Sequence, residues 1–306
     1  MQTLTIVLEK ALPVFLMLAI GVLCCKKRII SREGVSAMKH FAVNITLPAV
    51  MFSAFATAEY SVNALVVPLV IFAVCVAMLL GGMAACRVMG IGGRLSPYLA
   101  AGFEAGMLGY ALFALLFPQE PTSSFAMIDL GQVLFVFTLY KALLAGRGGL
   151  KGVWQEALHA PTVWAIVIGI VVGASGLYCA LEPSGMSRVL DAAASFVAAP
   201  TSAVILLTIG YDLVSGEILW RKTAKLAGVR LVISALALGA VLLIDRFVLG
   251  GMMHPGALVL MLLLPPPYVL PVFADVEEER ADVSSALSVL TVISLVLFMV
   301  LTVVYR

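Results

Sequence analysis

Residues 264–271 read Leu-Pro-Pro-Pro-Tyr-Val-Leu-Pro, in the middle of an apolar run from about residue 253 to 275. A proline inside an α-helix removes one backbone hydrogen bond and clashes with the preceding turn, which costs about 3 kcal/mol or more. One proline would favour a kinked packing helix. Three in succession, with Pro271 after them, predict a broken helix.

The composition identifies the solvent of this run. The chain has 306 residues, of which 62% are apolar and 12% are charged, and its mean hydropathy is +1.12. Soluble domains average about half apolar and about a quarter charged residues. These values exclude a water-soluble enzyme, a disordered chain and a nucleic-acid-binding protein, and the net charge of +2 indicates no polyanionic partner. We therefore expect the lipid bilayer to be the main solvent.

Ten apolar stretches are long enough to cross a bilayer as helices, since a spanning helix needs about 20 such residues. The sequence thus predicts an all-α membrane protein of ten helices, numbered here in chain order, at 3–25, 37–58, 62–86, 97–118, 122–144, 161–181, 192–214, 227–249, 253–275 and 283–305.

Basic residues predict the orientation, because Lys and Arg favour cytoplasmic loops. Fifteen of them lie after odd-numbered helices and four lie on the other side. We expect a multi-pass plasma (inner) membrane protein with both termini outside the cytoplasm. The cluster Lys26-Lys27-Arg28 follows the first apolar run, so this run is expected to be a first spanning helix and not a cleaved signal peptide.

Five helices per half predict inverted-topology repeats, residues 1–150 and 151–306. Helices one and six share a Pro and a Gly at equal spacing, Pro13 with Gly21 and Pro161 with Gly169. Helices two and seven both contain an interior proline, Pro48 and Pro200. Helices four and nine both contain interruptions, and the shared order supports the repeat.

Helix four carries Gly102, Glu104, Gly106 and Gly109. The glycines suit either a flexible break or close helix packing. A carboxylate inside a membrane helix is costly and is a functional candidate by default. The alternative for Glu104 is a structural partner of a basic side chain, or a residue near a helix end that reaches water.

Two broken helices that meet at the midplane expose the N–H groups of half-helix N-termini, which suit a carboxylate. The candidate substrate-binding residues are Asn44, Pro48, Glu104, Gly106, Pro265, Pro266 and Tyr268, and the candidate ion-coupling residues are Glu104 and Asp129. Asn44 alternatively makes an interhelical hydrogen bond, and Asp129 a capping contact at the outer boundary. We expect Arg230 to extend toward the membrane interface and residues 277–280 to be a solvated loop.

Other chemistry is not indicated. The chain has no metalloprotease, serine-hydrolase or nucleotide-binding motif, and no enzyme activity, cofactor or metal site is expected. The five cysteines include no outer pair, so no structural disulfide is predicted.

These residues resemble the auxin efflux carrier family, which includes bacterial malate or malonate permeases. The resemblance extends over essentially the whole chain and depends on the order of short motifs: Leu12-Pro13-Val-Phe, Ser31-Arg-Glu-Gly-Val, Asn44-Ile-Thr-Leu-Pro48, Gly106-Met-Leu-Gly109, Asp129-Leu-Gly, Leu207-Thr-Ile-Gly210 and the proline-rich helix nine.

The resemblance implies two inverted five-helix repeats, similar to sodium–bile acid symporters and sodium–proton antiporters, with a scaffold bundle and a transport bundle in which helices four and nine cross. It also implies transport of organic anions. The sequence departs from the family at Glu104, where an Asn is usual, and at Tyr268-Val269-Leu270, where an Asn often follows the proline.

The function predicted is secondary active transport of a small organic acid such as a mono- or dicarboxylate, by alternating access. Because burial favours the protonated carboxyl group, Glu104 is expected to couple this transport to protons. The alternative is a sodium- or proton-coupled cation antiporter that uses Glu104. A homodimer through helices two and seven is a further expectation.

Overall fold

The computed structural model describes residues 2–58, 60, 66–145, 161–214, 220–268, 270 and 279–305. These residues form helices joined by short turns, and no strand occurs among them. The elements of the first half are α1 (Gln2–Lys27), α2 (Arg32–Phe41), η1 (Ala42–Thr46), α3 (Leu47–Ala56), α4 (Val66–Val88), η2 (Ser96–Ala100), η3 (Ala105–Gly109), α5 (Tyr110–Leu116), α6 (Thr122–Phe135), η4 (Val136–Tyr140) and α7 (Lys141–Ala145).

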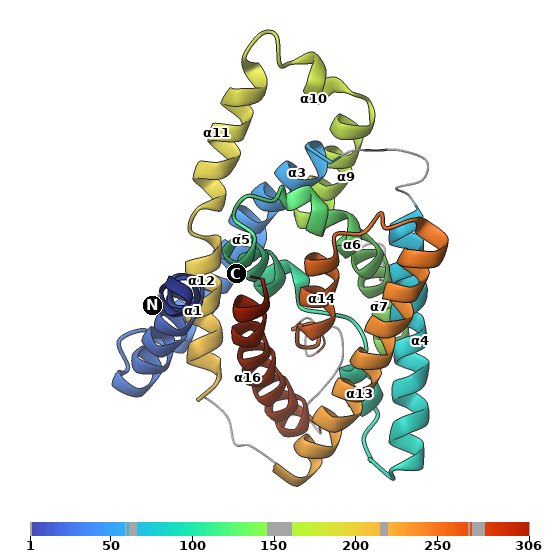
Figure 1. Ribbon diagram of the computed structural model, residues 1–306. Coiled ribbons are helices and arrows are strands. Elements are labelled where there is room, and N and C mark those ends of the chain that lie inside the picture. Colours follow the sequence, from blue (N-terminus) through green and yellow to red (C-terminus); the bar gives the residue numbers. More distant parts are fainter. Residues whose placement is uncertain are drawn as a thin grey trace.

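The second half repeats this helical character (Figure 1). Its elements are α9 (Pro161–Ala174), α10 (Leu177–Ala180), α11 (Met186–Ala198), α12 (Thr201–Asp212), α13 (Trp220–Ile244), η5 (Asp245–Leu249), α14 (Pro255–Leu263) and α16 (Arg280–Val304).

Six helices among the described residues are long and apolar enough to cross a membrane, at Arg32–Ala56, Val66–Val88, Thr122–Leu144, Met186–Tyr211, Trp220–Leu249 and Ser285–Val304. The shorter apolar helix Pro161–Ala174 lies where helix six is predicted. Predicted helices two, three, five, seven, eight and ten therefore coincide with candidate spans. Pro271 and the rest of helix nine after it lie outside the described residues.

Two helix pairs pack with very close backbones. In the first, α1 lies against α12 (Figure 1), and a Cβ added to Gly210 would lie 2.2 Å from the Leu18 carbonyl oxygen. In the second, α3 lies against α9, and a Cβ added to Gly169 would lie 2.9 Å from the Phe52 carbonyl oxygen. Small residues permit this approach in both pairs.

The remaining helices form a second group that contains the interrupted segments. α4 packs against α6 and α13, and α13 packs against α14 and α16. The turn η2 packs against α4 and α13, whereas η3 and α5 lie between this group and α12 (Figure 1).

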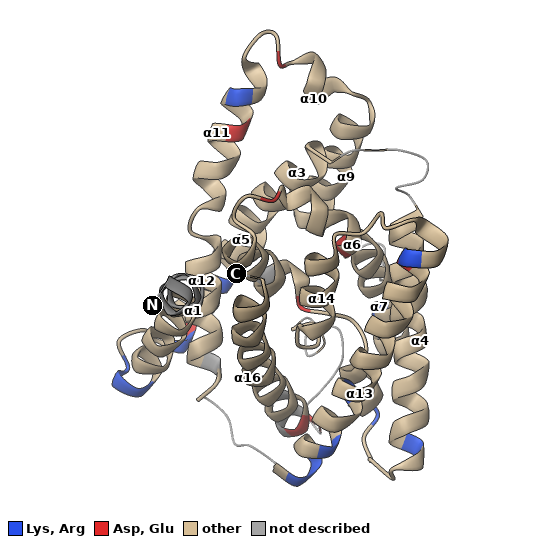
Figure 2. Ribbon diagram, in the orientation of Figure 1, with Lys and Arg blue, Asp and Glu red and all other residues tan. Residues whose placement is uncertain are grey.

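Basic side chains gather at one end of the helices (Figure 2). Lys26 and Lys27 occupy the last turn of α1, and Arg87 occupies the last turn of α4. The N-terminal end of α13 adds Arg221, Lys222 and Lys225. This grouping agrees with the loop asymmetry in the sequence.

Candidate functional site: the crossing of two broken helices

Helix four is interrupted at residues 101–104, here called the first break. The 3₁₀ turn η2 ends at Ala100, residues 101–104 are not helical, and the π-helical turn η3 begins at Ala105. Gly102 has φ +70°, and a Cβ there would lie 2.8 Å from Pro267 Cγ. A glycine suits this position because the backbone is left-handed and the neighbouring proline leaves no space for a side chain.

Helix nine is interrupted at residues 264–268, here called the second break. α14 ends at Leu263, and Leu264 is extended, with φ −65° and ψ 153°. Leu264, Pro265, Pro266 and Pro267 are all buried. The prolines end the helix because their nitrogens cannot donate the next bonds of the ladder.

The two breaks meet, and we call their meeting point the crossing. The Glu104 backbone N–H donates to the Pro265 carbonyl oxygen at 2.9 Å. The Tyr268 backbone N–H donates to the Glu104 carboxylate oxygen Oε2. Glu104 is only 6% exposed, so its carboxyl group is held inside the protein at a backbone donor of the second break.

Side chains from neighbouring helices satisfy the carbonyl groups that the breaks free. Arg230 Nη1 donates to Leu99 O at 3.0 Å, and Nη2 donates to Gly102 O and Leu264 O, each at 2.8 Å. Gln132 Nε2 donates to Phe103 O at 2.9 Å. Buried backbone groups need such partners, so these contacts make the unwound backbone tolerable in an apolar bundle.

Arg230 corrects an expectation from the sequence. It does not extend to the interface, because it is 2% exposed and contacts both breaks. Helix eight begins at Trp220 and not at residue 227, which places Arg230 well inside the helix. The available signal was a charge within an apolar segment, the same signal that identified Glu104.

Asp129 is fully buried on α6, next to the first break. Gln132 donates to its Oδ1 at 3.2 Å, while Oδ2, Gln132 Oε1 and the Tyr110 hydroxyl have no hydrogen-bond partner among the described residues. Asp129 is near enough to both Glu104 and Tyr110 to interact electrostatically. Asp129 is therefore a buried neighbour of the crossing.

The other predicted residues differ in their relation to the crossing. The Tyr268 hydroxyl forms a 2.6 Å hydrogen bond with Thr291 Oγ1 of α16, which ties the second break to that helix. A Cβ added to Gly106 would lie 3.5 Å from Leu47 Cδ2, so η3 adjoins the start of α3.

Asn44 and Pro48 lie on helix two. The exposed Asn44 side chain donates to the His40 carbonyl oxygen of its own helix at 3.0 Å. This contact is neither the substrate contact nor the interhelical hydrogen bond considered from the sequence. Pro48 is the second residue of α3, which follows the π-helical turn η1.

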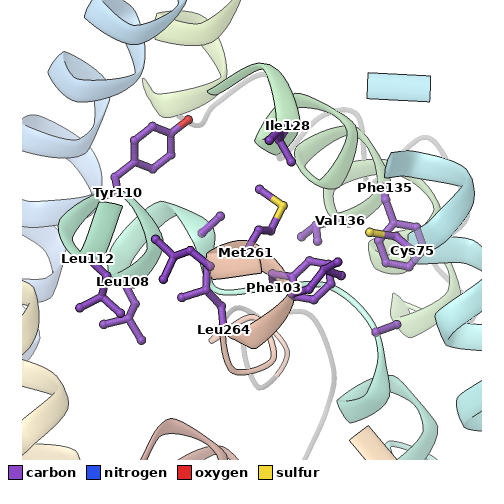
Figure 3. Close-up of a cluster of buried hydrophobic side chains, with 14 of the residues drawn as sticks. Cys75, Phe103, Leu108, Tyr110, Leu112, Ile128, Phe135, Val136, Met261 and Leu264 are labelled. Carbon is purple, nitrogen blue, oxygen red and sulfur yellow. The ribbon is translucent and has the colours of Figure 1, made fainter. Parts of the chain in front are cut away.

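Apolar side chains surround the crossing (Figure 3). Phe103, Leu108, Met261 and Leu264 are each no more than 2% exposed. The Arg230 guanidinium lies 5.3 Å from the centroid of the Phe103 ring, a distance at which a cation is attracted to the ring face. The polar groups of the crossing therefore lie in surroundings of low polarity, where electrostatic interactions are strong.

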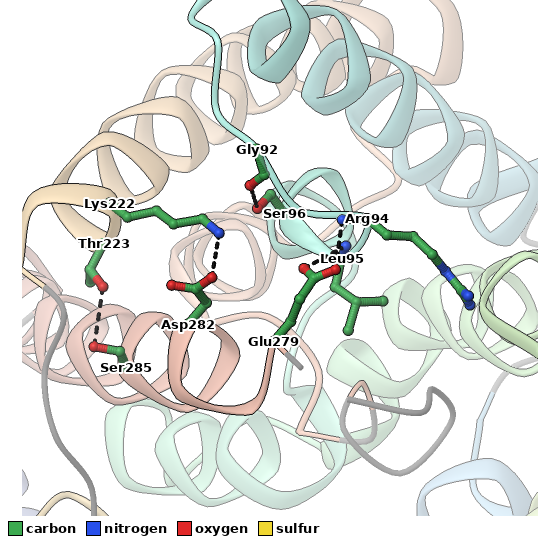
Figure 4. Close-up of polar contacts among 9 residues, drawn as sticks. All are labelled: Gly92, Arg94, Leu95, Ser96, Lys222, Thr223, Glu279, Asp282 and Ser285. Carbon is green, nitrogen blue, oxygen red and sulfur yellow. Dashed lines mark hydrogen bonds and ion pairs between the residues drawn. The ribbon is translucent and has the colours of Figure 1, made fainter. Parts of the chain in front are cut away.

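Polar contacts also join the segments that lead into the helices (Figure 4). The Glu279 carboxylate accepts the backbone N–H of Arg94 at 2.7 Å and that of Leu95 at 3.0 Å. Lys222 of α13 pairs with Asp282 of α16. The half-buried Glu279 thus ties the start of α16 to the segment that leads into η2, while residues 277 and 278 of the predicted loop lie outside the described residues.

No group of three or more His, Cys, Asp or Glu side chains that could hold a metal ion occurs in the part of the chain that the structure describes.

Comparison with known proteins gives a family match for about the first third of the chain. Residues 6–102 match the family model described as membrane transport protein. No curated protein matches the chain. The matched segment includes Asn44 and Pro48 and ends at Gly102 in the first break. Over these residues the chain is similar to a family of membrane transport proteins.

Proposed function

We propose that the chain is a secondary active transporter of a small organic anion, such as a mono- or dicarboxylate, with its substrate site at the crossing. The observation that carries this proposal is the contact of the two breaks through Glu104, Pro265 and Tyr268. Transporters built this way bind substrate at the midplane, between discontinuous helices from the two halves.

The helix pairs support an inverted repeat of residues 1–150 and 151–306. In such a repeat, helix one corresponds to helix six and helix two to helix seven. The contact of α1 with α12, from helices one and seven, therefore corresponds to the contact of α9 with α3, from helices six and two. Both pairs pack closely. Likewise, helix three corresponds to helix eight and helix five to helix ten. The contact of α4 with α6 then corresponds to the contact of α13 with α16. We therefore propose that helices one, two, six and seven form the scaffold bundle and that the others form the transport bundle.

The Glu104 contact supports coupling to protons. The backbone N–H of Tyr268 binds the carboxylate of Glu104, and the same donor suits a substrate carboxylate. The two carboxylates would compete for this donor. A proton on Glu104 weakens it as an acceptor and frees the N–H, so proton and anion would bind together.

The test is uptake into proteoliposomes of labelled malonate, malate and short hydroxy acids under an inward proton gradient. We expect the wild type to accumulate at least one of these acids. Glu104→Gln should lose accumulation and its pH dependence but keep exchange of internal for external acid. Glu182→Gln, at an exposed position, is the matched control and should behave as the wild type. Full pH dependence in Glu104→Gln would contradict the proposal.

A cation antiporter is the second candidate. It is favoured by the two buried carboxyl groups, Glu104 and Asp129, which interact electrostatically. Sodium-dependent proton movement across the liposome membrane, without any organic acid and abolished by Glu104→Gln, would select this function over the first.

We also propose that the basic helix ends face the cytoplasm and that both termini lie outside, in the plasma (inner) membrane. The asymmetry of Lys and Arg supports this orientation. We likewise propose that the chain forms a homodimer through helices two and seven.

A further inference from the structure

Arg230 contacts both breaks from a third helix. It lies in α13, is 2% exposed, and its guanidinium donates to Leu99 O and Gly102 O of helix four and to Leu264 O of helix nine. These segments are far apart in the sequence, and one side chain connects them all.

The three carbonyl groups share an electrostatic character. Leu99 lies in the last turn of η2, Gly102 lies two residues after its end, and Leu264 is the C-cap of α14. Unpaired carbonyls make a helix C-terminus partially negative, and a cation stabilises it. Arg230 therefore neutralises two converging helix ends with a single charge.

An arginine suits this position better than a lysine. The planar guanidinium presents donors in fixed directions, and both hydrogens of Nη2 are used, one on each break. Lysine has a single nitrogen and no flat face. The Phe103 ring, 5.3 Å from the guanidinium carbon, lies beside the same group.

We propose that Arg230 is a positioning residue that holds the two breaks to α13, so that all three segments keep one geometry and move together during transport. The proposal deepens the proposed function and rests on it only in taking the crossing as the transport site. Arg230 is not assigned a contact with substrate, because its guanidinium contacts the backbone of the breaks and the Phe103 ring.

The test is hydrogen–deuterium exchange of the full chain in lipid nanodiscs, followed by mass spectrometry. The variants are Arg230→Lys, which keeps the charge but not the fork, and Arg230→Met, which keeps neither. The matched controls are Arg246→Lys and Arg246→Met, at an exposed position just after α13. The informative peptides contain the amides of Glu104 and Tyr268, which are hydrogen-bonded across the crossing.

We expect exchange to be about tenfold faster in both peptides in Arg230→Met, with a smaller increase in Arg230→Lys, because loss of the guanidinium makes local opening easier. Peptides from α1 and α12 and both control variants should match the wild type. Unchanged exchange at the crossing, a change at only one break, or an equal rise in all helices would each overturn the proposal.

If Arg230→Met does not fold, Arg230→Lys decides by the same criteria. Absence of organic-acid uptake by the wild type would contradict the proposed function but would not alter the exchange result, so the two failures are distinguishable.

Discussion

At the residue scale, Gly102 is a position of the crossing that leaves little room for a side chain. Its φ of +70° and the 2.8 Å that would separate an added Cβ from Pro267 both oppose substitution. We predict that Gly102→Ala lowers the free energy of unfolding by about 1–3 kcal/mol. Thermal unfolding of the purified protein measures this effect.

The control for this substitution is Gly239→Ala. Gly239 is in the interior of α13, and a Cβ there would meet nothing within 4 Å. Alanine favours helix over glycine by about 1 kcal/mol, so this variant should be as stable as the wild type or more stable. Equal effects of the two substitutions would show that the crossing imposes no special constraint at Gly102.

The hydrogen bond between Tyr268 and Thr291 is a second residue-scale test. Tyr268→Phe removes a 2.6 Å contact between the second break and α16. We expect a loss of about 0.5–1.5 kcal/mol, and a smaller further loss when Thr291→Val is added, because the pair is then already broken. Strict additivity in the double-mutant cycle would argue against this contact.

Glu104 and Arg230 show what single residues reveal before the fold is known. Glu104 could be predicted because a carboxylate deep in an apolar helix needs a partner. Arg230 has the same property, but Arg221, Lys222 and Lys225 precede it, so the sequence pattern favours the last residue of an interfacial group. Its three backbone acceptors come from distant segments, and no local pattern encodes them.

At the element scale, the close helix pairs depend on glycine. A Cβ on Gly210 or Gly169 would approach a backbone carbonyl oxygen to 2.2 Å or 2.9 Å, so the helices would have to separate. We predict that Gly210→Ala and Gly169→Ala each destabilise the protein by about 1–3 kcal/mol. Gly228→Ala in α13, where a Cβ would meet nothing within 4 Å, is the control in the same thermal assay, and an equally large loss there would contradict the packing argument.

The sequence predicted where helices occur better than it predicted the residues at which they begin. Helix seven begins at Met186 and helix eight at Trp220, earlier than residues 192 and 227. Both additional segments contain charged residues, such as Arg188 and Lys222, that hydropathy excludes from a span. A helix continues past the apolar part because its backbone hydrogen bonds do not require apolar side chains.

The break at the three prolines could be predicted from backbone chemistry alone. Its meeting with helix four was expected from the interruptions in both helices and from the family resemblance, but the individual atomic contacts could not be predicted. The contact of Glu104 with Pro265 and Tyr268 depends on how helices from both halves pack, and sequence order contains no direct record of that packing.

At the scale of the whole molecule, the orientation can be tested with a native cysteine. Cys179 is exposed after α9, whereas Cys24, Cys75 and Cys86 are buried. With both termini outside, Cys179 lies on the outer face. We predict that a membrane-impermeant maleimide labels it in intact cells and that Cys179→Ser abolishes this labelling. Labelling of Cys179 only after permeabilisation would show that the protein has the opposite orientation.

The central claim is that solute binds where the two breaks meet, and protection from alkylation tests it most directly. In a cysteine-free background, Gly106→Cys places a thiol beside the crossing, Tyr268→Cys provides a second position, and Ser184→Cys in the exposed turn before α11 is the control. Every organic acid that the wild type transports should slow alkylation at position 106 or 268 and leave position 184 unaffected. Transported acids that leave alkylation at both crossing positions unchanged would contradict the account.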